Sequence, residues 1–115
     1  MIKSGRLRAL AVSSPKRIGM LPDVPTVAES GLPELKGFEA LAWNGVLVAA
    51  GTPRAVVDRI NSALNAALQE PTVKERLKAA GLEPVGGTPE QFAQLMHDES
   101  NKWAPIIKRS GARID

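Results

Sequence analysis

The residues that could do chemistry are few in this sequence. The chain has one histidine, His97, and no cysteine. A serine nucleophile activated by a histidine would have to use His97, but no nucleophile motif accompanies it. Asp98 and Glu99 are adjacent, and neighbouring residues on a helix point in different directions; the same reason disfavours a metal site made of His97 and Asp98. We therefore expect no catalytic residue, no metal and no enzyme, and we interpret His97 as a surface histidine.

Two helix starts resemble anion sites in outline only. The segment GTPRAVVD lacks the spacing and the lysine of a phosphate-binding loop. Free backbone amides at a helix start can hold an anion, but capping of the helix by Thr52 is the simpler interpretation. The segment GGTPEQ has the same two interpretations. No motif indicates a cofactor, and we expect none.

A proline-bracketed acid in MLPDVPTVAESG is the first candidate for ligand binding. Pro22 and Pro25 fix the backbone on both sides of Asp23. Thr26 and Glu29 then fit a capping box at the start of a short helix. Asp23 could hydrogen-bond its own backbone in a turn, or it could face a ligand. We take Asp23 and Thr26 as candidate ligand contacts.

The second candidate region is Trp43 with its neighbours in ALAWNGVLVA. Trp43 and Asn44 interrupt an apolar segment beside Gly45, where the backbone could approach a ligand closely. The alternative is that Trp43 is a core residue, because tryptophan is usually mostly buried. Trp43 completes the set of candidate ligand contacts.

Composition and charge set broad limits on the partners. The 115 residues are 43% hydrophobic and 23% charged, with a formal net charge of +3, as in an ordinary single soluble domain. The basic balance weakly favours anionic partners. A basic cluster near the start lacks the interleaved aromatic residues of a nucleic-acid surface, so we expect a solvated face and no nucleic acid; it comprises Lys3, Arg6, Arg8, Lys16 and Arg17.

The elements that would position these residues alternate between strands and helices. Apolar runs predict strands at residues 7–12 and 40–49, and a strand or extended segment at 82–87. Helical spacing and caps predict a helix of barely two turns after Thr26 and helices at 53–70, 72–80 and from Pro89 to Gly111; Pro105 should kink the last one or end its first part near Ala104. The pattern is that of an α/β fold.

Several segments together resemble one known family. GRLRALAVSSPKR, LPDVPTVAESGLP, WNGVLVAAGTPRAVVDRIN, PTVKERLKAAGLEPVGGTPEQF and KWAPIIKRSGARID are similar, in this order, to the substrate-binding proteins of tripartite tricarboxylate transporters, the Bug family of the TctC type. The resemblance implies a type II periplasmic-binding-protein-like (Venus-flytrap) fold. It also implies a periplasmic receptor that binds small carboxylates, such as di- or tricarboxylates or amino-acid-like acids, and delivers them to membrane permease subunits without chemistry.

The resemblance covers only the C-terminal part of such a receptor, because family members are much longer. It implies that residues 1–40 finish the second lobe, that 41–50 form a crossover strand or hinge, and that 51–115 are the C-terminal part of the first lobe. The N-terminal residues show no signal peptide. Strands and helices without their neighbours leave unpaired edges and apolar faces, so we expect this chain to form a homo-oligomer.

Three hypotheses of function remain open. The first is a fragment of a receptor for small carboxylates, and the second is a self-associating interaction module with no ligand. The third, a small enzyme, has the least support, because no pair of base and nucleophile can be assembled from the sequence. Titration with a panel of carboxylates separates the first two.

Overall fold

The chain divides into two compact units, Met1–Asn44 and Gly45–Asp115. The computed structural model describes residues 2 and 4–113, so the predicted role of Lys3 in a solvated basic face lies outside the described residues. Among those residues, no helix combines the length and the apolar character that a membrane crossing requires.

The first unit is built from loops and two 3-10 turns, η1 (Val27–Ser30) and η2 (Pro33–Leu35). An isolated parallel bridge joins Val12 to Thr26: the Val12 amide donates to the Pro25 carbonyl, and the Val27 amide donates to the Val12 carbonyl, both at 2.9 Å. The strand predicted at residues 7–12 is therefore reduced to one bridging residue.

The turn η1 confirms the predicted capping box but not the predicted length. The Thr26 hydroxyl accepts from the Glu29 amide while the Glu29 carboxylate accepts from the Thr26 amide. Gly31 follows with φ 79°, a left-handed conformation that glycine adopts without a steric penalty. The 3-10 turn between Thr26 and Gly31 has only four residues, fewer than the two helical turns expected. A separate turn begins at Pro33.

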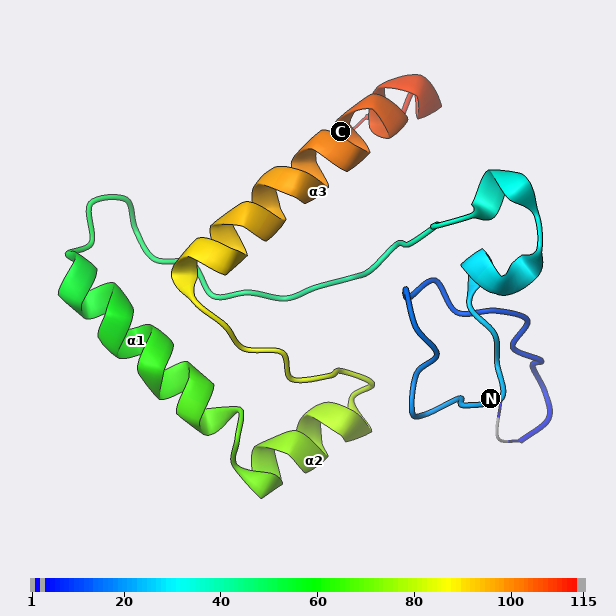
Figure 1. The fold of residues 1–115 in the computed structure, drawn as a ribbon. Coiled ribbons are helices and arrows are strands. Elements are labelled where there is room, and N and C mark those ends of the chain that lie inside the picture. The colour runs from blue at the N-terminus through cyan, green and yellow to red at the C-terminus, as the bar shows by residue number, and fades with distance from the viewer. Residues whose placement is uncertain (1, 3, 114–115) are drawn as a thin grey trace. The chain divides into compact units, whose positions relative to one another are not determined.

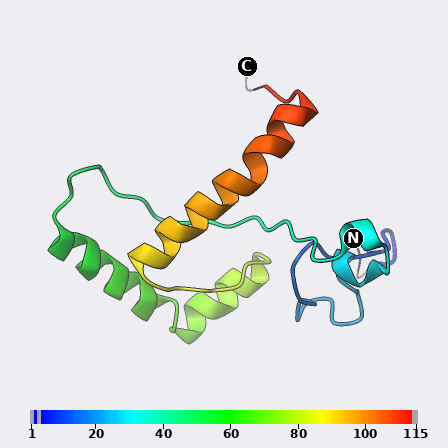
Figure 2. The ribbon, with the colours of Figure 1, turned by 45° about the horizontal axis from the view of Figure 1, so that its top comes forward.

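The second unit carries three α-helices, α1 (Arg54–Ala67), α2 (Pro71–Ala79) and α3 (Pro89–Ser110) (Figure 1). They confirm the three longer helices expected from apolar spacing and caps. Figures 1 and 2 show the loop after α2 turning back to the start of α3. The second unit thus consists of helices joined by short connections.

The start of α1 differs from the expectation. Pro53 is its N-cap and no side chain caps it. The Thr52 hydroxyl instead donates to the Ala49 carbonyl at 2.8 Å, within the preceding turn. The prediction that Thr52 caps this helix is therefore wrong, because its hydroxyl is used on the N-terminal side of the proline.

The end of α2 follows the Schellman pattern. The Leu82 amide donates to the Leu77 carbonyl at 2.9 Å, and the Gly81 amide donates to the Lys78 carbonyl at 3.0 Å. Gly81 has φ 79°. These bonds satisfy carbonyls that the helix itself leaves unpaired, and Gly81 is the residue that closes the helix.

Helix α3 begins at a capping box and continues through Pro105. The Thr88 hydroxyl accepts from the Gln91 amide, and the Gln91 side chain accepts from the Thr88 amide. The prediction that a first part ends near Ala104 is wrong, since α3 is one helix to Ser110 (Figure 1). A proline removes a single donor, and Gly111, with φ 70°, is the residue that ends the helix.

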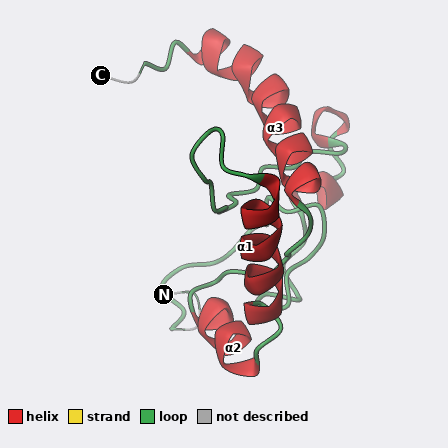
Figure 3. Cartoon of the chain, turned by 90° about the vertical axis from the view of Figure 1, so that its left-hand side faces the viewer, coloured by secondary structure: helices red, strands yellow, loops and turns green. Residues whose placement is uncertain are grey.

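The predicted α/β pattern is not confirmed, because no strand forms among residues 2 and 4–113 (Figure 3). Residues 44–48 have no backbone–backbone hydrogen bond within the described part of the chain. The segment 82–87 is likewise neither strand nor helix. A strand is stable only beside a partner strand, so apolar segments without such a partner remain extended loops.

Neither unit encloses an apolar centre in the described residues. No hydrophobic side chain there is buried, and Thr26, at 3% exposure, is the buried polar residue. Helix α1 keeps apolar side chains partly exposed: Val56 retains 45% and Leu64 39% of its accessible surface. Polar contacts therefore provide much of the local order in both units.

Candidate functional site

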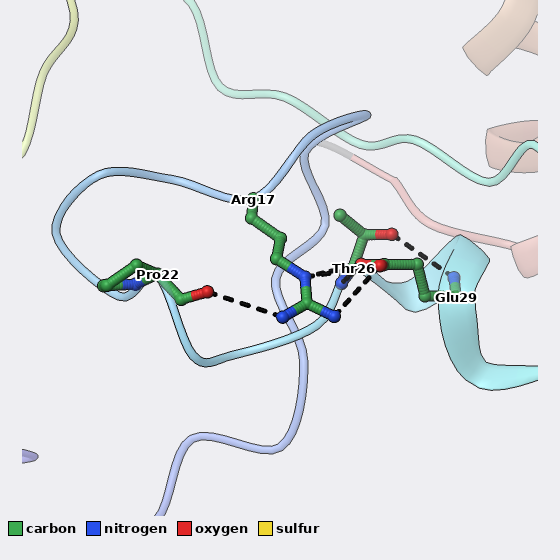
Figure 4. Close-up of polar contacts among 4 residues, drawn as sticks. All are labelled: Arg17, Pro22, Thr26 and Glu29. Carbon is green, nitrogen blue, oxygen red and sulfur yellow. Dashed lines mark hydrogen bonds and ion pairs between the residues drawn. The ribbon is translucent and has the colours of Figure 1, made fainter.

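The proline-bracketed loop of the first unit is closed by an arginine and a glutamate twelve residues apart (Figure 4). Arg17 Nε lies 3.2 Å from both carboxylate oxygens of Glu29, and Arg17 Nη2 lies 3.0 Å from Oε1. Arg17 Nη1 also donates to the Pro22 carbonyl at 3.5 Å. The guanidinium thus ties the middle and the far end of the loop to its start.

Glu29 serves the helix cap and the ion pair at the same time. Its Oε2 accepts from the Thr26 amide at 2.7 Å. The Thr26 hydroxyl accepts from the Glu29 amide at 3.3 Å. Because the hydroxyl is buried and already engaged, Thr26 holds the loop in this structure, and its predicted contact with a ligand stays a prediction.

The electrostatics of the loop follow from these contacts. The Arg17 hydrogen bond and then the Thr26 backbone amide lower the pKa of Glu29 from 4.5 to about 2. The same hydrogen bond, with the charge of Glu29, raises the pKa of Arg17. Both side chains remain nearly half exposed, at 47% and 45%, so water weakens the attraction between them.

Asp23 lies exposed within the second of two successive tight turns. The Leu21 amide donates to the Ile18 carbonyl at 3.0 Å, and the Val24 amide to the Leu21 carbonyl at 3.1 Å. The Asp23 carboxylate makes no hydrogen bond within the described residues, so the interpretation as a backbone-bonded turn aspartate is not supported. The negative charge of Asp23 helps to raise the pKa of Arg17.

Trp43 lies in the extended segment that follows η2. It keeps 41% of its surface exposed, so the alternative that it is a core residue is not supported. Asp23 and Thr26 share the proline-bracketed loop, whereas Trp43 belongs to the extended segment of the same unit. Its contact with a ligand also stays a prediction.

The structure reveals a second polar cluster that the sequence did not suggest. We call it the amide clamp: Asn61 and Asn65 of α1 with Gly87 of the loop before α3. Asn65 Nδ2 donates to the Gly87 carbonyl at 2.8 Å, and the Gly87 amide donates to Asn65 Oδ1 at 2.9 Å. Asn61 Nδ2 donates to the same carbonyl at 3.0 Å. The clamp holds the start of α3 against α1.

Sequence reasoning missed Arg17 and Glu29 as a pair, and both asparagines of the clamp. Arg17 was expected in a solvated basic face, and Glu29 only in a cap. A spare carboxylate oxygen on a capping glutamate was a weak signal for a basic partner. The four-residue spacing of Asn61 and Asn65 places them on one helix face, but nothing local indicates Gly87, more than twenty residues away, as their partner.

The chemistry open to these clusters is binding and positioning. Within residues 2 and 4–113, no group of three or more potential metal ligands comes together. His97 is 69% exposed and lies beside Asp98 and Asn101 on α3. Exposed on the helix surface, it matches the expected surface histidine.

Known proteins are similar to this chain over almost its whole length. The family model described as tripartite tricarboxylate transporter family receptor (TctC) matches residues 1–112. A Pseudomonas sp. (strain P51) protein, named "UPF0065 protein in tcbD-tcbE intergenic region", is 47% identical over 107 residues, which cover 92% of this chain and 31% of that protein. Protein BugT of Bordetella pertussis is 40% identical over 113 residues, 98% of this chain and 34% of BugT.

The lengths of these relatives matter for interpretation. The chain spans about a third of each of the two proteins just described. It covers 62% of a Pseudomonas knackmussii protein, the "UPF0065 protein in clcB-clcD intergenic region", at 36% identity. This family consists of substrate-binding receptors and is not an enzyme family. The chain belongs to the tripartite tricarboxylate transporter receptor family.

Proposed function

We propose that this chain forms the C-terminal part of a periplasmic receptor for small carboxylates that feeds a tripartite tricarboxylate transporter. The observation that carries the proposal is the match of the receptor family over residues 1–112. The ligand class is a di- or tricarboxylate or an amino-acid-like acid, and the partners are the membrane subunits of the transporter. Nucleic acid has no part in this function.

The division of the chain supports the proposed assignment to lobes. On this proposal, residues 1–40 finish the second lobe, 41–50 cross between the lobes, and 51–115 belong to the first lobe. The boundary between the two compact units, at Asn44 and Gly45, falls inside the proposed crossover. The exposed apolar side chains of both units fit surfaces that the rest of a receptor would cover.

Each proposed ligand contact has a distinct role. The exposed Trp43 offers an aromatic face to the ligand. The Asp23 carboxylate would repel a carboxylate, so it suits the ammonium group of an amino-acid-like acid or a hydroxyl group. Thr26 acts through the loop that it holds, because its hydroxyl is already engaged by the Glu29 amide.

Calorimetric titration of the chain with a panel of di- and tricarboxylates and amino-acid-like acids tests the proposal. We expect saturable heat with at least one acid, weakened by Trp43→Ala. Asp23→Asn should weaken the binding of an amino-acid-like acid, because it removes the charge that faces the ammonium group. Asn101→Ala, on the exposed surface of α3, is the matched control and should change nothing. A flat trace across the whole panel would count against ligand binding by this chain.

Fluorescence gives a second readout of the same binding. The chain has two tryptophans, so Trp103→Phe leaves Trp43 as the reporter. Its emission should change with the acid that gives heat in calorimetry. Emission that stays constant while heat is released would remove Trp43 from the proposed site.

A second candidate function is self-association without a ligand. It is favoured by the extended residues 44–48, which lack backbone–backbone hydrogen bonds within the described part of the chain and expose 60% of Val46 and 71% of Leu47. Such a segment can pair with the same segment of a second copy. Light scattering after size-exclusion chromatography should then show a homo-oligomer that Val46→Lys weakens; a monodisperse monomer at micromolar concentration contradicts it.

A further inference from the structure

We propose that Asn44 is a site of spontaneous covalent modification, at which the asparagine side chain cyclises onto the Gly45 amide. The observation that draws attention to it is the pair Asn44–Gly45 in an extended, exposed segment. Glycine lacks a Cβ, so it obstructs approach to its own amide nitrogen less than any other residue. The site stands independently of the proposed receptor function.

The reaction needs only the chain and water. The Gly45 nitrogen attacks Cγ of Asn44, a new carbon–nitrogen bond closes a five-membered succinimide, and the bond from Cγ to Nδ2 breaks. The leaving amide nitrogen takes up the proton lost by the Gly45 nitrogen and departs as ammonia. Water then opens the ring at either carbonyl and leaves aspartate or isoaspartate at position 44.

The local structure leaves both reacting groups available. Asn44 is exposed, and neither its side chain nor the Gly45 amide has a hydrogen bond in the part of the chain that the structure describes. Residues 41–48 form neither helix nor strand there. A hydrogen-bonded ladder or a helix would hold the amide away from the side chain, and neither constrains Asn44.

The other asparagines provide an internal comparison. The chain has three more, and each lies in an α-helix with its side chain engaged. Asn61 and Asn65 bind the Gly87 carbonyl and are half-buried in the amide clamp. Asn101 lies beside the His97 ring on α3. Their following residues, Ser62, Ala66 and Lys102, all carry side chains. Only Asn44 combines a following glycine, exposure and the absence of helix.

Packing explains why glycine occupies position 45. A Cβ built on Gly45 would overlap the ring of Phe92 of α3. A larger residue at position 45 would have to displace that ring, so the packing of the second unit favours the residue that makes Asn44 reactive.

The modification changes the chain at the boundary between its two compact units. Either product adds one negative charge at position 44. The isoaspartate product also routes the backbone through the side chain, which inserts one methylene between the units. Both changes fall within the segment proposed to cross between lobes.

The test is to age the full chain in mildly alkaline buffer, which promotes loss of the Gly45 amide proton, and to map peptides by mass spectrometry at intervals. We expect a gain of about one dalton in the peptide with Asn44, as separable aspartate and isoaspartate forms, at least ~10-fold faster than at Asn61. Asn44→Gln, whose cyclisation needs a six-membered ring, should abolish it.

Two results would overturn the proposal. One is an intact Asn44 peptide after the others have begun to change. The other is conversion at Asn61, Asn65 and Asn101 at the same rate as at Asn44, which would show that the local structure has no influence. Carboxylate titration of the Asn44→Gln variant is a separate measurement, so failure of the receptor proposal is recognised independently.

Discussion

The two compact units are held by polar clamps of different chemistry. In the first, the guanidinium of Arg17 binds the carboxylate of Glu29 across a loop, and both groups are charged and nearly half exposed. In the second, Asn65 exchanges two neutral hydrogen bonds with Gly87, and the groups are half-buried. Neither clamp surrounds a buried apolar side chain in the described residues.

The difference teaches what each unit should respond to. A charged clamp in water depends on pH and on salt. A neutral clamp depends on desolvation, because breaking it leaves half-buried amide groups without partners. The largest effect is expected at the neutral clamp, and the smallest at an exposed ion pair of the second unit.

The largest effect is expected from Asn65→Ala. The change removes the acceptor of the Gly87 amide and a donor to its carbonyl. Local opening at Gly87 should become easier by about 1–3 kcal/mol, the range for a donor or acceptor that loses its partner on burial. Hydrogen exchange of the Gly87 amide measures this.

Asn61→Ala and Asn101→Ala are graded controls for that measurement. Asn61 makes one bond to Gly87, to its carbonyl, so its loss should cost about 1 kcal/mol. Asn101 is exposed and makes no contact with the clamp. Equal protection of Gly87 in all three variants would show that the clamp does not hold the loop.

A smaller effect is expected at the start of α3. Thr88→Ala removes the acceptor of the Gln91 amide and should destabilise the first turn by about 1 kcal/mol. Thr52→Ala is the matched control before α1, where the hydroxyl bonds Ala49 and caps no helix. Amide exchange at both helix starts should show loss for α3 alone; equal loss at both would contradict the assignment of these caps.

The charged clamp should fail in acid. The pKa of Glu29 is lowered from 4.5 to about 2, so the carboxylate stabilises the loop fully above pH 4.5 and loses that effect as the pH falls through about 2. Resonances of the loop should shift over this window, while those of the neutral amide clamp should not. Carboxyl resonance titration by nuclear magnetic resonance follows Glu29 directly.

Arg17→Gln sharpens that experiment. Removing the guanidinium should raise the pKa of Glu29 toward its ordinary value, and the Thr26 amide should keep it below that value. A pKa of Glu29 that is the same in the variant and the parent chain would mean that the ion pair is absent in solution.

The smallest effect is expected from Arg54→Gln. Arg54 pairs with Asp58 at 2.7 Å and with Glu90 at 2.6 Å, linking α1 to the start of α3. Its side chain is 66% exposed, and exposed pairs contribute little. Amide protection in the first turn of α3 should fall slightly in dilute buffer and be unchanged in concentrated salt; a large, salt-independent loss would mean that this pair matters more than the amide clamp.

Local rules made the helical part of the molecule predictable. The caps at Thr26 and Thr88 and the left-handed glycines at 31, 81 and 111 involve residues only a few positions apart. Their geometry is therefore written in short segments of sequence. Thr52 is the exception. Its hydroxyl could cap α1 or bond within the preceding turn, and in the structure it donates to the Ala49 carbonyl of that turn. Short sequence segments along nearly the whole chain also indicated the family, and the match of the family model over residues 1–112 confirms it.

Only the tertiary structure decided which distant groups meet. Arg17 finds Glu29 across twelve residues, Asn65 finds Gly87 across twenty-two, and Phe92 packs on Gly45. These pairings depend on the path of the intervening chain. The lack of strands among the described residues has the same explanation. An apolar run in the sequence indicates which side chains a strand would bury, but a strand forms only where a second strand lies beside it. Sequence fixes local winding, whereas contact between distant residues is a property of the folded chain.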